Sequence, residues 1–163
     1  MNNNDILIRL RYALDIKDTD MLKIFKLGGL DVTREQLQQL LTKQEEDSAK
    51  DEFCDLHTLE CFLNGFITFK RGKAPAKNGV EPQPTFLITG QRNVNNVVLK
   101  KVKIALALTS DEMLDVLRLA KVYASPSELS AILRKEGHRN YQDCKDRYAR
   151  NFLKGLAIKY REV

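Results

Sequence analysis

The sequence predicts an all-α protein built from two tandem copies of a small unit of approximately four helices. Two observations support this prediction. The chain matches itself when it is shifted by about 90 residues, and the apolar residues within each copy recur at helical spacing. We place the copies at residues 1–71 and 95–163, with a linker at residues 72–94. Neither copy contains a pattern typical of a β-strand.

The internal match is extensive. A shift of 92 residues aligns residues 3–43 with residues 95–135 without a gap, and eleven of these 41 positions are identical. About two or three identities would be expected by chance at average residue usage. After a two-residue deletion the shift becomes 90, and FLNG at residues 62–65 meets FLKG at residues 152–155. Two long copies indicate a duplicated domain rather than a solenoid of short repeats. In the first copy the identical positions are Asn3, Asn4, Leu7, Ala13, Leu14, Met21, Leu22, Leu27, Leu37, Leu41 and Lys43.

The first and fourth helices of each copy are predicted from their apolar stripes. In the first helix the stripe follows the i, i+4, i+7 pattern and ends at Leu14, or at Leu106 in the second copy. In the fourth helix the apolar positions of the two copies are Leu59, Phe62, Leu63, Phe66 and Ile67, matched by Ala149, Phe152, Leu153, Leu156 and Ala157.

The second and third helices are predicted from their start signals. Asp18 in the first copy and Ser110 in the second are plausible N-caps of the second helix. The third helix is expected to begin after Thr33 or Ser125, and the Gln or Glu three residues later would complete a capping box. Pro126 occupies the first helical position, which proline favours.

Between the copies, residues 72–92 hold three of the four prolines and three glycines, so this stretch is interpreted as a linker. Its apolar patch, residues 86–88, is expected to pack across the copies or to form a short extended arm. The highly charged residues 44–52 are expected to form a solvated connection or helix end.

Three segments carry a resemblance to a known family. They are NNDILIRLRYAL near the N-terminus, FLNGFITFKRGK at the end of the first copy and NNVVLKKVKIAL at the start of the second. These segments closely resemble the YehS-like bacterial proteins, which are classed as a tandem domain of unknown function. The resemblance covers nearly the whole chain and implies an intact two-repeat protein. It implies no activity, cofactor or catalytic residue.

Composition excludes several classes of protein. A chain of 163 residues with 43% hydrophobic content can build a core, so disorder throughout is not expected. The longest apolar runs, such as residues 104–108, are far shorter than the roughly eighteen residues of a membrane helix. The N-terminus lacks the pattern of a secretion signal, so cytoplasmic residence is expected. With only three cysteines, a disulfide framework is not expected.

The net positive charge of the chain comes mainly from its second copy. Residues 93–163 contain fourteen Lys/Arg and eight Asp/Glu, whereas residues 1–71 contain ten and thirteen. Such an excess suits nucleic acid, acidic proteins or the acidic half of the chain itself. The second and third helices could form a helix-turn-helix unit, although Glu128 would face phosphates unfavourably. The residues expected to contact nucleic acid are Arg134, Lys135, His138 and Arg139.

One face of the predicted fourth helix is a candidate metal site. Cys54, His57 and Cys61 fall at i, i+3 and i+7. The two cysteines would be about 10.5 Å apart along a helix, too far to share one ion. The second copy does not repeat the set. We therefore expect no metal, and interpret these cysteines as small, buried or half-buried packing residues.

Two pairs of matching residues suggest contact surfaces. Gly65 and Gly155 lie in helix interiors, where glycine is unfavourable and often marks close backbone approach, so we expect a contact between copies or subunits there. Tyr12 and Ile104 lie nearly opposite the apolar stripe of the first helix and suggest a partner surface. The basic residues that flank this stripe are expected to extend their charges into water; they are Arg9, Arg11, Lys101 and Lys103.

Catalysis has the least support from the sequence. Asp15, Asp18 and Asp20 form an acidic cluster, but the second copy does not keep it, and the pattern of an EF-hand loop fails. No phosphate-binding loop, nucleophile elbow or pair of metal-binding histidines occurs. We therefore predict no catalytic residue and no cofactor, and lean against an enzyme. The leading hypothesis is a non-enzymatic interaction or adaptor module with protein partners, which include further copies of the chain in a homo-oligomer. The alternative is nucleic-acid binding by the basic second copy, and no membrane contact is expected.

Overall fold

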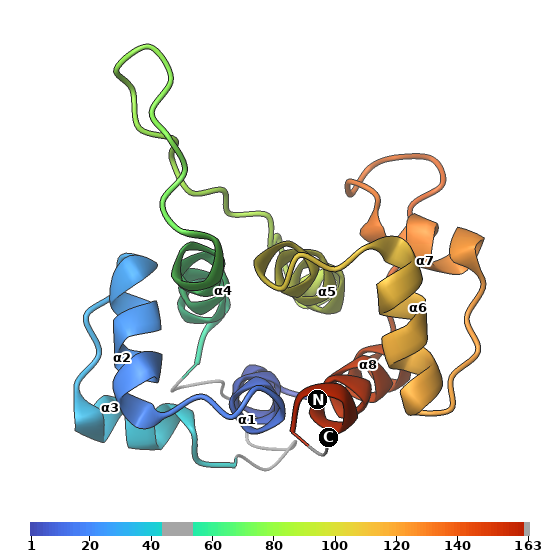
Figure 1. Ribbon diagram of the computed structural model, residues 1–163, viewed down its shortest axis with the longest axis horizontal. Helices are drawn as coiled ribbons and strands as arrows, with labels where there is room; N and C mark the ends of the chain where they lie inside the picture. Colours follow the sequence, from blue (N-terminus) through green and yellow to red (C-terminus); the bar gives the residue numbers. More distant parts are fainter. Residues whose placement is uncertain (44–53, 162–163) are drawn as a thin grey trace.

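The computed structural model describes residues 1–43 and 54–161, which form eight α-helices and no β-strand (Figure 1). Four helices fall in each copy, so the all-α prediction and the duplicated unit are confirmed. The charged stretch at residues 44–52 lies outside the described residues. No described helix is both long enough and apolar enough to span a membrane. The helices are α1 (Asn3–Ala13), α2 (Asp18–Leu27), α3 (Arg34–Leu40), α4 (Leu56–Arg71), α5 (Val94–Ala105), α6 (Ser110–Leu119), α7 (Pro126–Leu133) and α8 (Asp146–Tyr160).

The third helix of each copy begins as predicted. At α3, Thr33 and Gln36 exchange two hydrogen bonds of 2.9 and 3.1 Å, which complete a capping box. At α7, the hydroxyl of Ser125 accepts a hydrogen bond from the amide of Glu128, and Pro126 is the first helical residue. Only this half of the box predicted at α7 is present among the described hydrogen bonds.

The N-caps predicted for the second helices are wrong by one residue. Asp18 and Ser110 are the first residues of α2 and α6 rather than their caps. Thr109 caps α6, because its hydroxyl accepts from the amide of Glu112 while the Glu112 carboxylate accepts from the amide of Thr109. At α2 the cap position is Lys17, whose side chain makes no capping hydrogen bond.

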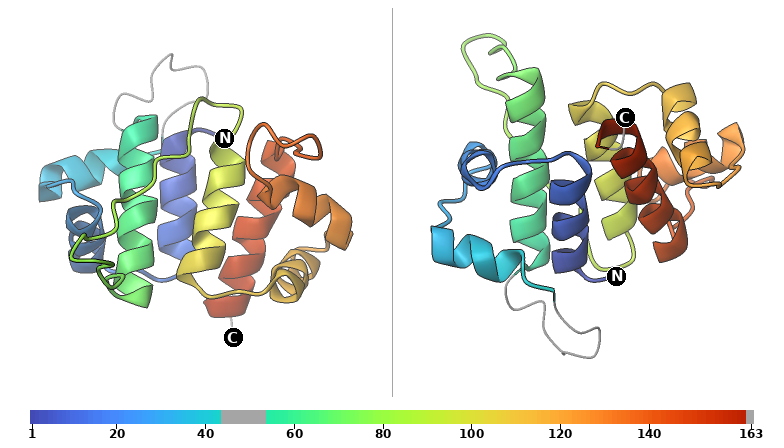
Figure 2. Two further views of the ribbon diagram at one scale, coloured as in Figure 1. Left: turned by 90° about the horizontal axis from the view of Figure 1, so that it is seen from above. Right: turned by 60° about the horizontal axis from the view of Figure 1, so that its bottom comes forward.

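Four long helices, α1, α4, α5 and α8, lie side by side and run in the same direction (Figure 2). Contacts at both ends of α1 show this for α8. The N-terminal amine of Met1 lies 2.8 Å from a carboxylate oxygen of Asp146 at the start of α8. At the other end, Arg161 donates a hydrogen bond of 3.0 Å to the carbonyl of Tyr12.

The two copies exchange their first helices. Helix α1 packs on α8 of the other copy, and α5 packs on α4 in the same way, whereas α2 packs on α4 and α6 on α8 within one copy. The result is a twofold arrangement in which α2 and α3 flank one side of the four long helices and α6 and α7 flank the other (Figure 1). The buried apolar side chains of both copies form one continuous core. Each copy therefore completes the other.

The first and second helices of both copies end in the same kind of turn. After α5, the amide of Leu108 bonds to the carbonyl of Lys103 at 3.0 Å, which is the closing bond of a Schellman motif. In this motif the residue that follows the C-cap adopts the left-handed conformation, and after α5 this residue is Ala107. The residues with positive φ at the four helix ends are Asp15, Gly29, Ala107 and Lys121.

The linker is long because α4 and α5 run in the same direction. The chain leaves α4 at Gly72, whose φ is 79°, and must travel back along a helix of about 24 Å before α5 can begin at Val94. The first part of the linker makes a tight turn closed by Lys77 and Val80, which exchange two backbone hydrogen bonds. Figure 2 shows the second part running along α4 towards the start of α5.

Candidate functional site

A buried ion pair joins the two copies near the middle of the long helices. The ammonium of Lys101 on α5 lies 2.7 Å from a carboxylate oxygen of Glu60 on α4, and these side chains are 3% and 2% exposed. The same ammonium donates to the side chain of Asn64 and to the carbonyl of Thr85, at 2.6 Å each. Burial lowers the pKa of Lys101, and the Glu60 carboxylate opposes this shift. Three acceptors match the three donors of an ammonium group, so the buried charge is fully paired.

Glu60 also holds part of the linker. We call residues 85–88 the linker segment, and the line of contact between α4 and α5 that it covers the α4–α5 seam. The two carboxylate oxygens of Glu60 accept hydrogen bonds from the backbone amides of Leu87 and Ile88, at 2.6 and 2.9 Å. Asn64 donates to the carbonyl of Thr85 at 3.0 Å. Side chains on α4 and α5 therefore bind the backbone of an extended segment through hydrogen bonds.

An aromatic contact completes the α4–α5 seam. The rings of Phe86 and His57 stack with their centroids 5.0 Å apart. The apolar patch of the linker thus packs across the copies, which is one of the two arrangements expected for it. The prediction that Lys101 extends its charge into water is wrong, because the linker segment covers it. Arg9, at the equivalent position of α1, is exposed.

The three residues of the candidate metal site do not lie on one helix. Cys54 precedes the start of α4, so the helical spacing assumed for it is wrong. The Nε2 atom of His57 lies 3.4 Å from the sulfur of Cys61. Burial raises the pKa of the Cys61 thiol, and the carboxylates of Asp55 and Glu60 raise it further. A protonated, buried thiol packs well but is a poor nucleophile and metal ligand.

Gly65 and Gly155 mark close helix crossings within each copy. A Cβ atom at Gly65 would overlap the carbonyl oxygen of Ile24 on α2, and one at Gly155 would overlap that of Val116 on α6. The close approach was predicted, but the expected contact between copies or subunits is wrong at these positions. Glycine is needed here because backbone meets backbone between the second and fourth helices.

Tyr12 and Ile104 are exposed, at 51% and 44%. They occupy equivalent positions near the ends of α1 and α5. The guanidinium of Arg161 lies 4.1 Å from the centroid of the Tyr12 ring, so the other copy contacts one face of this ring. A role in partner binding stays a prediction for both residues.

The recurring Asn-Asn pair ties together the starts of the long helices. Asn95 donates to the carbonyl of Cys144 at 3.1 Å, and Asn3 makes the equivalent bond to Cys54 at 3.0 Å. The second asparagine of each pair donates to a carbonyl at the end of the third helix; these bonds are Asn4 to Leu40 and Asn96 to Ile132. The identity of these residues in both copies therefore has a structural cause.

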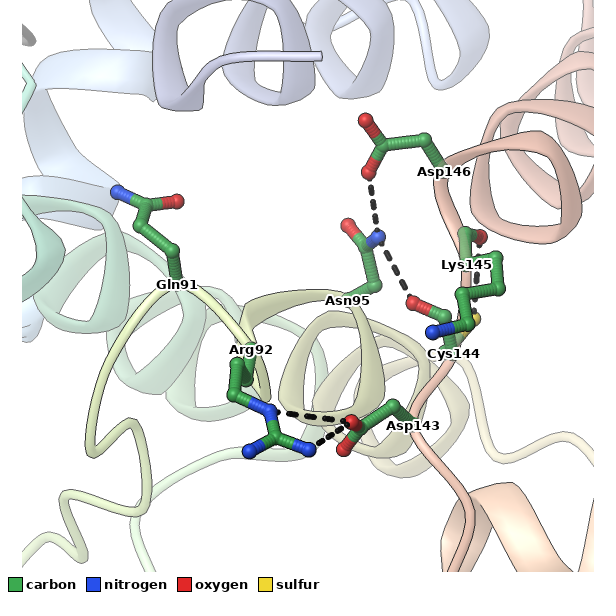
Figure 3. Close-up of a pocket in the computed structure, with 7 residues that line it drawn as sticks. All are labelled: Gln91, Arg92, Asn95, Asp143, Cys144, Lys145 and Asp146. Atoms are coloured by element: carbon green, nitrogen blue, oxygen red, sulfur yellow. Dashed lines mark hydrogen bonds and ion pairs between the residues drawn. The ribbon is translucent and has the colours of Figure 1, made fainter.

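A polar cavity of about 420 Å³ opens where α5 and α8 begin (Figure 3). At its centre the side-chain amide of Asn95 donates to the carbonyl of Cys144 and, at 2.8 Å, to Asp146. Beside it, Arg92 lies 3.1 Å from Asp143. The polar groups that Figure 3 shows around this cavity are largely paired with one another.

The titratable groups of this cavity are not poised for chemistry. Burial raises the pKa of the Cys144 thiol to about 12, so its thiolate is scarce at neutral pH. Partial burial also raises the pKa of Asp146, but hydrogen bonds from the N-terminal amine and from Asn95 outweigh it, and the pKa lies below its ordinary value. We interpret the cavity as a junction of helix starts.

The four residues predicted to contact nucleic acid are exposed in one loop after α7. Two of them line a cavity of about 230 Å³ beside the linker segment. An acidic residue of the same loop, Glu136, accepts a hydrogen bond of 2.9 Å from the hydroxyl of Thr89. The loop is therefore anchored to the linker and carries both signs of charge. Its predicted contact residues are Arg134, Lys135, His138 and Arg139.

The role of Glu60 and Asn64 was not predicted from the sequence. The available signal was the position of Glu60 inside the apolar run LECFL, where a carboxylate is costly without a partner. The position of Lys101 gave no such signal, because an exposed Arg9 occupies the same place in the first copy.

Comparisons with known proteins agree with the duplicated organisation. A family model described as "Protein of unknown function (DUF1456)" matches residues 3–72 and 95–162. A protein of Escherichia coli (strain K12), named "Uncharacterized protein YehS", is 36% identical over 159 residues, which cover 98% of this chain and 96% of that protein. No solved structure matches the chain.

Proposed function

The chain belongs to the DUF1456 family of proteins of unknown function, and from this premise we propose that it is a non-enzymatic interaction module that binds extended peptide segments across a seam between helices of different copies. The single observation that carries the proposal is the way the chain holds its own linker segment. Glu60 accepts two consecutive backbone amides of that segment, and Asn64 and Lys101 donate to its Thr85 carbonyl. Recognition of backbone groups by fixed polar side chains is how extended peptides are held on protein surfaces.

The raised thiol pKa values support a role without covalent chemistry. Cys61 and Cys144 are buried, and burial shifts both thiols away from the reactive thiolate. The buried ion pair is likewise saturated by its own partners, because Lys101 meets three acceptors and Glu60 meets three donors.

The proposal is tested with a variant whose linker segment no longer occupies the α4–α5 seam, to which the segment is added as a separate peptide. In the variant F86S/L87P/I88P the linker keeps its length but loses its aromatic side chain and both amide donors to Glu60, because proline has no backbone N–H. A fluorescent peptide of residues 83–90 should then bind the variant, as measured by anisotropy. Its dissociation constant should be about millimolar or lower, because a short tether holds the natural segment at an effective concentration of about that size. It should not bind the natural chain, whose seam is already filled.

A chemically matched peptide provides the control. Methylation of the backbone nitrogens of Leu87 and Ile88 removes both donors to Glu60 without changing any side chain. This peptide should not bind the emptied variant. A variant that keeps its helical circular dichroism but ignores the unmodified peptide would refute the proposed function.

Tyr12 and Ile104 support a second contact surface, through which copies of the chain would associate. Their exposure at equivalent positions is the supporting observation. Light scattering should then show an oligomer that Tyr12→Ser weakens. A strictly monomeric natural chain would rule out this surface as a self-association site.

Nucleic-acid binding remains a second candidate function. It is favoured by the exposure of the basic residues in the loop after α7. Binding should fall steeply with salt, and neutralising Arg134, Lys135 and Arg139 together should weaken it. No binding of a labelled duplex or single strand at low salt would dismiss this candidate.

A further inference from the structure

The twofold arrangement creates a second seam, between α1 and α8. Because α1 packs on α8 as α5 packs on α4, each residue of the α4–α5 seam has an equivalent here. The internal alignment pairs Lys101 with Arg9, Glu60 with Arg150 and Asn64 with Lys154. We call Arg9, Arg150 and Lys154, together with the line of contact between their helices, the α1–α8 seam.

The α1–α8 seam is positively charged, and its three cations are exposed in the described part of the chain. Arg9, Arg150 and Lys154 are all exposed, whereas Glu60 and Lys101 at the equivalent places are buried under the linker segment. Within residues 1–43 and 54–161, none of the three cations forms an ion pair. The carboxylate nearest in sequence on α8, Asp146, is bound by the N-terminal amine and by Asn95, and the nearby charge of Arg150 also helps to lower its pKa without forming an ion pair with it.

The positive charge of the α1–α8 seam indicates which kind of segment it can bind. At the α4–α5 seam Glu60 accepts two backbone amides, but Arg150 in its place can only donate. A neutral segment would offer these three cations no opposite charge. A segment with carboxylate side chains would supply them, and arginine binds carboxylates with two parallel hydrogen bonds.

A fourth residue suits an aromatic side chain in the same segment. Arg147 is exposed and equivalent to His57, on which Phe86 stacks. Arginine also stacks on aromatic rings, so an aromatic residue in the position of Phe86 would keep its contact.

We propose that the α1–α8 seam binds an acidic, extended segment of a partner protein, in the register in which the α4–α5 seam holds the linker segment. This inference rests on the proposed function, and it adds the location of the site and the charge of the partner.

The test uses the full natural chain and two labelled peptides. Both span residues 83–89 of the linker, and one carries glutamate in place of Thr85 and Thr89. The acidic peptide should bind, as measured by fluorescence anisotropy at low salt, and the neutral peptide should bind at least tenfold more weakly. Equal binding of both peptides, or of neither, would overturn the inference.

Two triple variants locate the site. R9Q/R150Q/K154Q neutralises exposed side chains only, so its circular dichroism should be unchanged. Its affinity for the acidic peptide should fall roughly tenfold or more. R134Q/K135Q/R139Q removes the same charge from the loop after α7 and should change the affinity less than twofold. The reverse order of effects would move the site to that loop and refute the inference.

Two outcomes separate this inference from its alternatives. If labelled DNA or RNA binds, is released by R9Q/R150Q/K154Q, and the acidic peptide does not bind, the seam is a nucleic-acid site and the inference fails. If the emptied α4–α5 seam takes up the linker peptide while the acidic peptide ignores the natural chain, the proposed function stands and this inference alone is wrong.

Discussion

Lys101 and Arg9 occupy the same place in the duplicated unit, yet one is buried and the other is exposed. The difference comes from what lies over them. The linker segment passes over Lys101 and supplies a carbonyl acceptor, while Glu60 from the other copy supplies the opposite charge. A buried charge is tolerated only when its partners are complete.

Removing one partner of this ion pair should therefore be costly. Lys101→Met is expected to lower the free energy of unfolding by about 3–5 kcal/mol, because the Glu60 carboxylate would stay buried without a cation. Urea denaturation followed by circular dichroism measures the change. Arg9→Met at the equivalent, exposed position is the control and should change the stability by less than about 0.5 kcal/mol. Equal losses for the two variants would contradict the importance assigned to the pair.

Residue identity alone predicted some of these roles and missed others. The matching glycines, Gly65 and Gly155, indicated close approach, because glycine in a helix interior needs a local reason. Their partner helices could not be predicted, since that choice depends on packing between residues far apart in sequence. The burial of Lys101 was missed for the same reason: a covering segment lies outside the local pattern.

At the scale of single elements, the ends of the helices show how the copies solve the same problem with different residues. The turn after α1 uses Asp15 at a φ of 50°, and the turn after α5 uses Ala107 at 54°. Aspartate tolerates this left-handed conformation better than alanine does, because its side chain can bond locally. The second copy thus carries local strain at Ala107.

Relief of this strain gives a stabilising substitution. Ala107→Gly is expected to raise the free energy of unfolding by about 0.5–1 kcal/mol, because glycine adopts positive φ without a steric penalty. Ala120→Gly provides the matched control: Ala120 also ends a helix, but its φ is −91°, so glycine there should be neutral or destabilising. Thermal unfolding measures both. A lower melting temperature for Ala107→Gly would contradict the strain.

The start of α4 gives a prediction that depends on pH. Asp55 caps this helix by accepting a hydrogen bond of 2.7 Å from the amide of Thr58, and hydrogen bonds from Thr58 lower the pKa of Asp55. A lowered pKa in the folded state means stability that is present above about pH 4 and is lost as pH falls through the folded pKa.

Two substitutions separate the cap from its charge. Asp55→Ala should cost about 1 kcal/mol at pH 7, whereas Asp55→Asn should cost only a few tenths, because asparagine caps as well. Between pH 4 and pH 2 the natural chain should lose the contribution of Asp55 and approach the stability of Asp55→Asn. Urea denaturation at each pH measures this, and a constant difference between the two chains would contradict it.

Sequence patterns were most informative at this scale. Helical spacing predicted the four long helices, and Thr33 and Ser125 were correctly predicted to cap the third helices. The cap of α6 was displaced by one residue because Thr109 and Ser110 are both good caps, and only the reciprocal bond to Glu112 distinguishes them. The start of α2 was displaced for another reason: its cap position is Lys17, whose side chain makes no capping hydrogen bond and so leaves no signal in the sequence.

For the whole molecule, the exchange of first helices makes the two copies mutually dependent. Helix α1 packs mainly on α8, and α5 packs mainly on α4, although each also contacts the fourth helix of its own copy. This arrangement was not predicted, since the duplication is equally compatible with two separate bundles. The boundaries at residues 1–71, 72–94 and 95–163 stay a prediction about the repeat and do not describe two independently packed cores.

Separated copies should therefore fail to fold as monomers. The fragments of residues 1–82 and 83–163 are expected to lose most of their helical circular dichroism when alone, because a first helix without the fourth helix of the other copy exposes its apolar face. Mixing them in equal amounts should restore the signal and a single species of the full mass by sedimentation. A fragment that forms a stable helical monomer would contradict the exchange.

The common direction of α4 and α5 has a consequence for stoichiometry. Two unconnected copies related by a twofold axis would form two equivalent grooves and could bind two ligands. Once the copies are joined, the connection must retrace α4, and the shortest return lies in one of those grooves. Covalent joining thereby converts a bivalent assembly into a monovalent one, and we expect one bound peptide per chain in a titration.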